Sequence, residues 1–421
     1  MKAQLDTIVI GAGHAGLCTS YFLKQHKLSH FVFERHRIGN SWRSQRWDSF
    51  KLNTPNKLSY LPGFETRHSD SDGFISAKDF VAMLEQYVED FKLPVVENSH
   101  VISVEKVLDS ELFRVIVSTD GALNTYECVN VVVASGAHSR KIIPAHSGNV
   151  SPEIPQLHVA DYRNADSLPM GAVLVVGSGQ SGVQVADDLL DSGRKVFVST
   201  SMVARAPRRY RGKDVMEWMN LSGFMDQRTE NVTDPQVISM KQPQISGIGP
   251  RGKTVSLQSL AAKGAVIVGK TTRFDGTLVH LQANAADHVK FGDGFSRQVK
   301  GMVDEYINKA HIDAPSPLSD EADMPDRNAD CASLDTTLNL KEHDISSIIW
   351  CTGFDGDFSY LKLPVFNEKG MLMHQEGISE IKGLYFVGFP WLRKRKSGII
   401  LGIEEDVEFI GRRIQSAELT A

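Results

Sequence analysis

Two glycine-rich segments carry the clearest chemical signal in the sequence. Each follows a short run of β-branched residues and precedes a stretch of helical composition; they read Gly11-Ala12-Gly13-His14-Ala15-Gly16 and Gly177-Ser178-Gly179-Gln180-Ser181-Gly182. In such a strand–turn–helix unit the first glycine permits a tight turn, the second lets a pyrophosphate approach the backbone, and the third lets the helix pack against the strand. The N–H groups at the start of the helix bind the phosphates. The sequence therefore predicts two dinucleotide sites, with binding residues Gly11, Gly13, Gly16, Gly177, Gly179, Gln180, Ser181 and Gly182.

The strand after each glycine motif ends differently, which predicts two different cofactors. Glu34 ends the first of these strands, where a carboxylate can bind a ribose 2′-hydroxyl, so this unit suits the ADP half of FAD, with Arg35 as a further contact. The second strand ends without an acid that would repel a 2′-phosphate, and arginines follow it. Because guanidinium groups bind phosphate oxygens well, we expect NADPH here; a solvated surface run of arginines is the alternative. The predicted contacts are Ser199, Arg205, Arg208 and Arg209.

The elements around these motifs predict an α/β fold. Short apolar runs that suit buried parallel strands occur at 7–10, 131–134, 173–176 and 345–350, and a capping box at Ser76–Asp79 precedes a helical stretch. We predict two Rossmann-like dinucleotide-binding domains, with the NADP domain inserted into the FAD domain. The predicted FAD domain comprises residues 1–163 and 336–421, and the NADPH domain comprises residues 164–335, with an acidic surface loop near 312–334.

Composition excludes several other classes of protein. The chain has 421 residues, with 46 basic and 51 acidic side chains and a net charge of −5, which argues against a basic nucleic-acid-binding face. No apolar run reaches the roughly 20 residues of a membrane-spanning helix, and the first residues lack the pattern of a signal peptide. The four cysteines form neither a CxxC pair nor a metal-ligand spacing, which excludes a redox-active dithiol. We expect a cytoplasmic enzyme without a metal, and leave a homodimer open.

The motifs together resemble those of class B flavin-dependent monooxygenases. The resemblance rests on the two glycine motifs, on Cys351-Thr352-Gly353-Phe354 after a late strand, and on the segment 384–388. It implies that FAD and NADPH form a C4a-(hydro)peroxyflavin with O2, which oxygenates a small organic substrate. The family element that ends in an aromatic residue occurs here as His158-Val159-Ala160-Asp161-Tyr162. Tyr162 in place of tryptophan favours heteroatom oxygenation or hydroxylation; His158 either acts in catalysis or orders the domain junction.

The segment 42–55 resembles the part of the family that faces the flavin. The resemblance makes Asn53 the candidate catalytic residue, because a side-chain amide can donate a hydrogen bond beside the flavin; the alternative is that it caps a turn. Aromatic residues of this segment either flank the flavin ring or belong to the core. The remaining predicted FAD contacts are Trp42, Trp47, Thr54, Val104 and Ser135. An NADPH oxidase that releases hydrogen peroxide and a non-catalytic redox-sensing flavoprotein are the alternative functions.

Overall fold

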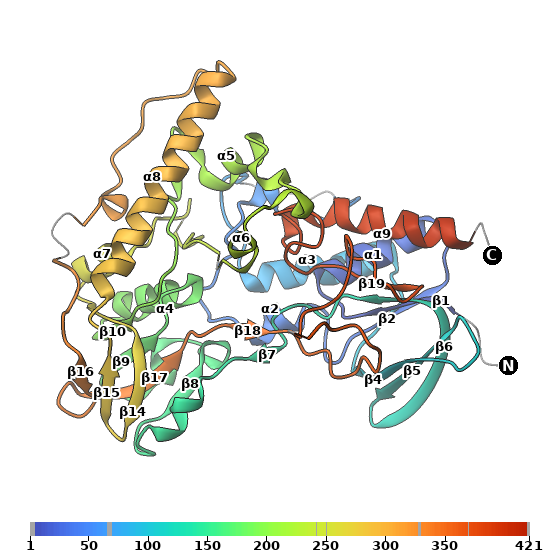
Figure 1. Cartoon of the computed structure of the whole chain (residues 1–421), viewed down its shortest axis with the longest axis horizontal. Helices are drawn as coiled ribbons and strands as arrows, with labels where there is room; N and C mark the ends of the chain where they lie inside the picture. Colours follow the sequence, from blue (N-terminus) through green and yellow to red (C-terminus); the bar gives the residue numbers. More distant parts are fainter. Residues whose placement is uncertain are drawn as a thin grey trace.

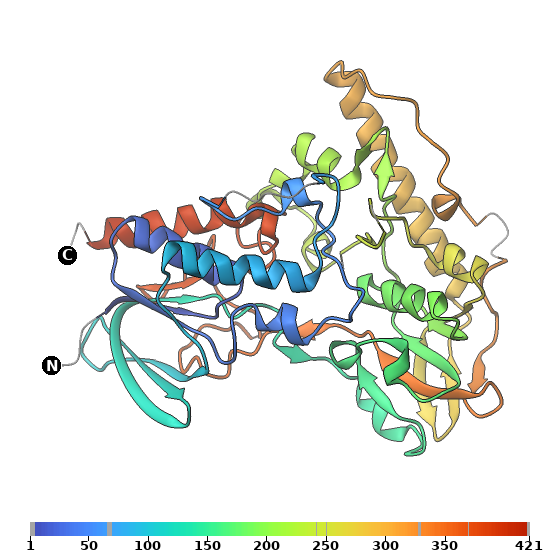
Figure 2. The same ribbon diagram turned by 180° about the vertical axis from the view of Figure 1, so that it is seen from behind.

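The protein consists of two α/β units that lie side by side in the computed structural model (Figure 1; Figure 2 shows the opposite side). The structure describes residues 5–64, 70–240, 242–249, 251–326, 330–368 and 370–418, so the start of the chain inspected for a signal peptide and part of the acidic loop lie outside the described residues. The first and the last described elements, β1 (Leu5–Ile10) and α9 (Ile403–Glu418), both belong to the first unit. Parallel strands form the centre of each unit, as the buried apolar runs predict.

The sheet of the first unit has the order β3-β2-β1-β6-β5-β4, with β19 paired to the carboxyl end of β6. The long strand β6 joins two kinds of sheet, because its first half pairs antiparallel with β5 and its second half pairs parallel with β1. Its carboxyl end therefore lies beside the first glycine motif. The strands are β1 (Leu5–Ile10), β2 (His30–Phe33), β3 (Val95–Val96), β4 (Ser99–Lys106), β5 (Phe113–Thr119), β6 (Ala122–Val133) and β19 (Leu384–Phe386).

Three helices cover one face of this sheet: α1 (His14–Gln25), α3 (Ala77–Phe91) and α9 (Ile403–Glu418) (Figures 1 and 2). The predicted cap of α3 is confirmed, since the Ser76 hydroxyl accepts a hydrogen bond from the Asp79 N–H at 3.0 Å and donates one to its carboxylate at 2.7 Å. The short helix α2 (Asn40–Ser44) follows β2 and leads into the segment 42–55.

The sheet of the second unit is parallel throughout, with the order β13-β10-β9-β17-β8. A three-stranded antiparallel sheet, β14-β15-β16, forms a further layer. The strands are β8 (Gln156–His158), β9 (Ala172–Val176), β10 (Val196–Ser199), β13 (Val266–Val268), β14 (Thr271–Asp275), β15 (Leu278–Leu281), β16 (Thr337–Asn339) and β17 (Ile345–Trp350). The helices are α4 (Gln180–Asp191), α5 (Val215–Leu221), α6 (Pro235–Ser239), α7 (Leu257–Ala262) and α8 (Ala285–Lys309). Among them, α8 projects furthest from the body of the molecule (Figure 1).

The sheets divide the chain at other places than the predicted domain boundaries at 163/164 and 335/336. Strand β8 precedes the first boundary and β16 and β17 follow the second, yet all three belong to the second unit. A buried apolar run such as Ile345–Trp350 suits either sheet, so its composition does not reveal which one it joins. The chain crosses between the units through β7 (Arg140–Lys141) and β18 (Phe354–Asp355), which pair antiparallel.

Candidate active site

The two glycine motifs form turns of the same geometry. Gly11 and Gly177 both have a φ of +104°, a conformation that favours glycine. A Cβ on Gly11 would lie 2.6 Å from the Ala134 carbonyl oxygen, and one on Gly177 would lie 2.5 Å from that of Cys351. Each turn therefore presses against the end of a neighbouring strand, β6 in the first unit and β17 in the second.

The second and third glycines of each motif have opposite surroundings. A Cβ on Gly16 or Gly182 would overlap the carbonyl oxygen of the first glycine of its own motif, so each helix lies directly against its turn. A Cβ on Gly13 or Gly179 would meet no protein atom within 4 Å. The space at the second glycine is thus open at the start of a helix, which is the arrangement that a pyrophosphate requires.

The first residue of each of these helices presents a buried polar atom. Nε2 of His14, at the start of α1, and Nε2 of Gln180, at the start of α4, have no hydrogen-bond partner among the described residues. Burial lowers the pKa of His14 to about 4, so its imidazole is neutral at pH 7. Open space, helix N–H groups and an unpartnered polar atom fit the phosphates of a dinucleotide at both motifs.

At the ribose end of the first motif Glu34 lies beside the turn, and its contact with a ribose stays a prediction. The Glu34 carboxylate accepts hydrogen bonds from the Ala12 N–H at 2.8 Å and the His36 N–H at 3.0 Å, which fixes it beside the turn. Arg35 is exposed next to it. The Ser135 hydroxyl, at the carboxyl end of β6, accepts a hydrogen bond from the Tyr360 hydroxyl at 2.9 Å.

The ribose end of the second motif differs from that of the first. The Ser199 hydroxyl is buried and donates to the Gly269 carbonyl at 3.0 Å, so its contact with a cofactor stays a prediction that its surroundings do not favour. Thr200 occupies the place that Glu34 has in the first unit, since Gly177 pairs with the strand there as Gly11 does with β2. Its hydroxyl donates to the Val268 carbonyl at 2.9 Å and lies 2.9 Å from Nδ1 of His288.

Arg205 is buried between two carboxylates, so its contact with the cofactor stays a prediction that its surroundings do not favour. Its side chain is 3% exposed and lies 2.7 Å from the Asp293 carboxylate and 2.9 Å from that of Asp323. Asp323 belongs to the predicted acidic surface loop but is buried, and it also accepts a hydrogen bond from Ser296 at 2.6 Å. Two carboxylates occupy the hydrogen-bonding edges of this guanidinium, which leaves no free edge for a phosphate. Its burial also contradicts the alternative of a solvated surface arginine.

Arg208 is buried at the junction of the two units, and its contact with the cofactor likewise stays a prediction. Its Nε donates to the Asp214 carboxylate at 2.7 Å, and its guanidinium lies 4.7 Å from the centre of the Phe74 ring. A further N–H donates to the Asn53 main-chain carbonyl at 2.9 Å. Arg209 is partly exposed, 3.8 Å from the Asp72 carboxylate, and its contact with NADPH stays a prediction.

The groups of Val104 are also used within the protein, and its contact with FAD stays a prediction that its surroundings do not favour. This residue lies within β4 and its side chain is fully buried. Its N–H donates to the Tyr360 carbonyl at 2.8 Å, and its own carbonyl accepts from the Lys362 N–H at 3.0 Å. With both main-chain groups used by the segment 360–362, Val104 has none left for a cofactor.

The segment 42–55 leaves the first unit and contacts the second. The Asn53 side-chain oxygen accepts hydrogen bonds from Nε2 of Gln184 at 2.8 Å and from the Gly247 N–H at 3.3 Å. The Asn53 Nδ2 has no hydrogen-bond partner within the part of the chain that the structure describes. Helix α4 of the second unit therefore fixes the Asn53 amide with one donor group free, and its role beside the flavin stays a prediction. Thr54 follows it, half-buried.

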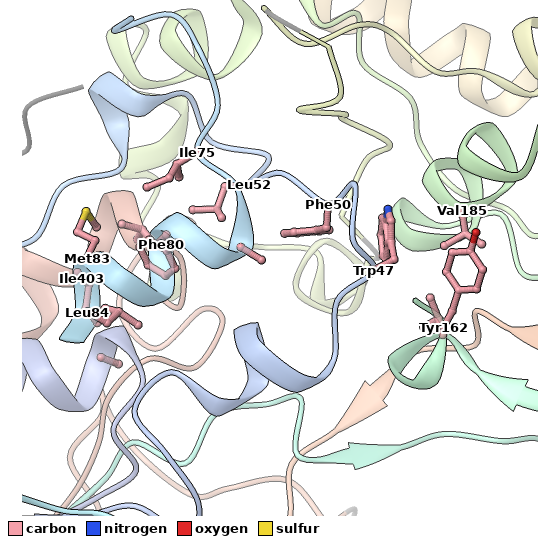
Figure 3. Packing of buried hydrophobic residues seen from close by; sticks show 14 of the residues in the cluster. Trp47, Phe50, Leu52, Ile75, Phe80, Met83, Leu84, Tyr162, Val185 and Ile403 are labelled. Atoms are coloured by element: carbon pink, nitrogen blue, oxygen red, sulfur yellow. The ribbon is translucent and has the colours of Figure 1, made fainter. Parts of the chain in front are cut away.

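The aromatic residues of this segment fill the space between the units. Trp47 is 3% exposed and packs edge-on against Phe50, with ring centres 5.0 Å apart. Tyr162 and Val185 of the second unit lie on its other side (Figure 3). Trp47 therefore belongs to the core, whereas Trp42 is half-buried and its contact with the flavin stays a prediction.

His158 and Tyr162 order the junction. Nδ1 of His158 accepts a hydrogen bond from the Ala160 N–H at 3.2 Å, so Nε2 carries the proton and donates to the Gly353 carbonyl at 3.0 Å. The Tyr162 hydroxyl donates to the Asp188 carboxylate of α4 at 2.6 Å. Both polar ends are thus used within the protein, which supports the structural role of His158.

Sequence reasoning missed the residues of α4 that reach across the junction, Gln184 and Asp188. Their spacing of four from Gln180 places all three on one face of the helix, which is the signal that could have identified them. The sequence offers no sign of what that face contacts. Among the described residues the structure contains no group of acidic, histidine or cysteine side chains that could hold a metal ion. None of the helices within the described ranges is both long and apolar enough to cross a membrane.

Comparison with known proteins identifies relatives along the whole chain. The family model described as pyridine nucleotide-disulphide oxidoreductase matches residues 8–267. An uncharacterized oxidoreductase, CzcO-like, of Geobacillus kaustophilus is 30% identical over 413 residues, which are 97% of this chain and 98% of the relative. The probable indole-3-pyruvate monooxygenase YUCCA7 of Arabidopsis thaliana is 28% identical over 320 residues, which are 70% of each chain.

Solved structures share the fold. The flavin-containing monooxygenase from Stenotrophomonas maltophilia is 19% identical with a TM-score of 0.64 and covers 99% of each chain. The bacillithiol disulfide reductase Bdr from Bacillus cereus is 14% identical, also with a TM-score of 0.64, over 99% of this chain and 100% of that one. These likenesses confirm the predicted α/β architecture with two Rossmann-like units. The chain therefore belongs to the pyridine nucleotide-disulphide oxidoreductase family, in its class B flavin monooxygenase-like group, and is an oxidoreductase.

Proposed function

We propose that this enzyme is an FAD- and NADPH-dependent monooxygenase that oxygenates a small organic substrate, by heteroatom oxygenation or hydroxylation. The observation that carries the proposal is the pair of open glycine turns, at Gly13 and Gly179, with the segment 42–55 hydrogen-bonded between their units. A bound flavin would supply acceptance of a hydride from NADPH and reaction with O2. The chain's own part is to hold both dinucleotides, orient them and exclude water.

The first unit suits FAD. The N–H groups at the start of α1 would bind its pyrophosphate, and the Glu34 carboxylate, already oriented by two main-chain N–H groups, would accept a hydrogen bond from the ribose. Each Glu34 oxygen retains a lone pair for that contact, because each accepts only one of the two main-chain hydrogen bonds.

The second unit suits NADPH at α4, whose first residue Gln180 presents a free amide nitrogen. The segment between the units would protect the oxygen reaction. Phe50 and Leu52 are buried there beside Trp47, and Asn53 holds a free amide donor next to this apolar group. A water-poor site with an oriented donor is what an oxygen-transfer reaction needs, since it favours transfer over release of hydrogen peroxide.

A disulfide reductase is the less favoured alternative. Such an enzyme needs two neighbouring thiols, and all four described cysteines are free. Burial raises the pKa of Cys18, Cys128 and Cys351, so these thiols are protonated and weakly nucleophilic at pH 7. An NADPH oxidase would use the same two nucleotide sites, and only the fate of the oxygen separates it from a monooxygenase.

The test measures whether the electrons of NADPH end in an oxygenated product or in hydrogen peroxide. The purified protein is reconstituted with FAD, reduced anaerobically with NADPH or NADH, and then mixed with O2 in the presence of candidate amines, sulfides and 2-oxo acids, including indole-3-pyruvate. A monooxygenase consumes one NADPH per oxygenated product and releases little peroxide. Stoichiometric peroxide with every substrate would support the oxidase instead, and a protein that binds no FAD would overturn both functions.

A further inference from the structure

Helix α4 carries a polar stripe, two positions of which contact the segment 42–55. Gln180, Gln184 and Asp188 lie four residues apart on one face, and each makes a hydrogen bond outside the helix. The helix starts at the second glycine motif, so this stripe runs from the expected NADPH pyrophosphate site toward the first unit.

The segment 42–55 is held by two successive positions of this stripe. Asp188 accepts a hydrogen bond from the Ser49 hydroxyl at 2.5 Å, and Gln184 donates one to the Asn53 side-chain oxygen at 2.8 Å. The contacts are one helical turn apart on α4 and four residues apart in the segment. They therefore fix both the position and the direction of the chain that carries Asn53.

The orientation of the Asn53 amide follows from its neighbours. The Gly247 N–H can only donate, so the Asn53 atom that faces it at 3.3 Å must be the oxygen. Gln184 then has to present its nitrogen to that oxygen, and the Asn53 Nδ2 is left pointing away from α4. Gln184 is 1% exposed, and its own oxygen is buried with no partner among the described residues.

We propose that Gln184 is a positioning residue that holds the Asn53 amide with its N–H donor toward the flavin side. This inference rests on the proposed function. Without Gln184 the amide could turn by 180° and present an acceptor where the reaction needs a donor. The same hydrogen bond joins α4, the expected NADPH-binding helix, to Asn53. A displacement of α4 would therefore move the Asn53 amide.

Two variants of Gln184 test the orientation. Gln184→Met has a similar volume and removes the donor, while Gln184→Glu keeps the shape and places an oxygen against the Asn53 oxygen. We expect both to retain FAD and to be reduced by NADPH within about twofold of the wild-type rate, with an unchanged KM for NADPH. We expect the peroxide released per NADPH to rise about fivefold for Gln184→Met, and further for Gln184→Glu, because the carboxylate repels the correct orientation.

A double-mutant cycle separates positioning from general packing. If Gln184 acts through Asn53, Gln184→Met adds nothing to the peroxide yield in an Asn53→Ala background. The control is Val185→Ala, which shortens a buried side chain of the same helix that cannot hydrogen-bond to Asn53; it should keep the wild-type yield. The change in flavin absorbance on adding NADP+ gives a second readout, and we expect both Gln184 variants to alter it and Val185→Ala to preserve it.

The outcomes distinguish the two proposals. The role of Gln184 would be overturned if both Gln184 variants keep the wild-type peroxide yield and flavin absorbance change while Asn53→Ala raises the peroxide yield. The monooxygenase proposal would still stand after that result. Additive effects of Gln184→Met and Asn53→Ala would also overturn it. A wild-type protein that binds no FAD, or that returns all of its electrons as peroxide, would overturn the proposed function itself.

Discussion

The two nucleotide units share one turn and differ in what surrounds it. In both, the first glycine has a φ of +104°, the third admits no Cβ, and the second borders open space. At the ribose end the first unit presents the Glu34 carboxylate, whereas the second presents the buried hydroxyl of Thr200. The turn is the same because in both units a helix and a neighbouring strand pack directly against it. The residues at the ribose end are not constrained by that packing and can differ with the cofactor.

The two units also differ in how their buried carboxylates are paired. In the second unit the buried carboxylates of Asp214, Asp293 and Asp323 each lie against an arginine. In the first unit Asp406 is buried with one oxygen unpartnered among the described residues, and Arg393 is 3.7 Å from the other. Of the arginines that follow β10, Arg205 and Arg208 are therefore part of the folded interior.

The largest expected effect is on folding, from alanine at the third glycine of either unit. In Gly16→Ala and Gly182→Ala the added methyl group would overlap a main-chain oxygen, so strand and helix must separate. We expect a loss on the order of 5 kcal/mol in the free energy of unfolding, measured by urea denaturation. If only one of the two variants is destabilised, the turns are less alike than their geometry indicates.

Valine at the second glycine should remove one cofactor without unfolding the protein. Gly13 and Gly179 both have extended backbones that any residue adopts, and a Cβ meets no protein atom there. Gly13→Val should purify soluble and colourless. Gly179→Val should be yellow but should not be reduced by NADPH, as followed by flavin absorbance. Loss of FAD from Gly179→Val would mean that the units are assigned the wrong way round.

Removing Arg205 should destabilise the second unit and leave its coenzyme preference unchanged. Arg205→Ala leaves the Asp293 and Asp323 carboxylates buried without their shared partner, which typically costs about 3–5 kcal/mol. The ratio of kcat/KM for NADPH to that for NADH should match the wild type, with Lys141→Ala on the surface as the control. A selective rise in KM for NADPH, with normal stability, would restore the phosphate-binding role.

Substitutions of Asn53 test the contact between the two units. Asn53→Ala should keep FAD and the rate of reduction by NADPH, while loss of one donor in a water-poor site costs about 3 kcal/mol, or roughly a hundredfold in the coupled oxygen reaction. Asn53→Asp keeps the oxygen that Gln184 and Gly247 contact but replaces the free donor. Both variants should release most electrons as peroxide; a coupled Asn53→Asp enzyme would show that the donor is not needed.

The smallest expected effect is a dependence of stability on pH in the first unit. Burial raises the pKa of Asp406 to about 6 from its ordinary value of 3.8, so between these values the folded state binds more protons than the unfolded state. Stability should therefore fall as pH rises from about 4 to about 6, by on the order of 2–3 kcal/mol. Asp406→Asn should remove this fall and stabilise the protein at pH 7; a parallel pH profile in the two proteins would contradict the assignment.

Local patterns in the sequence determined the turns and the elements next to them. The glycine motifs, the strands at 7–10 and 173–176 and the Ser76 cap all follow from contacts within a few residues, such as a methyl group that would overlap the preceding turn. Such contacts form whatever the rest of the chain does. The same reasoning placed Glu34, because its distance from the first glycine motif is set by one helix and one strand.

Only the tertiary structure decided how side chains far apart in the sequence are used. Arg208 and Asn53 are 155 positions apart, Gln184 and Asn53 are 131 apart, and Arg205 and Asp323 are 118 apart. A buried charge or amide takes the partner that lies next to it in the folded state, because leaving it unpaired away from water costs too much free energy. Residue type thus predicted that these buried charged and amide groups need partners. Which partners they have was determined by how the two units pack.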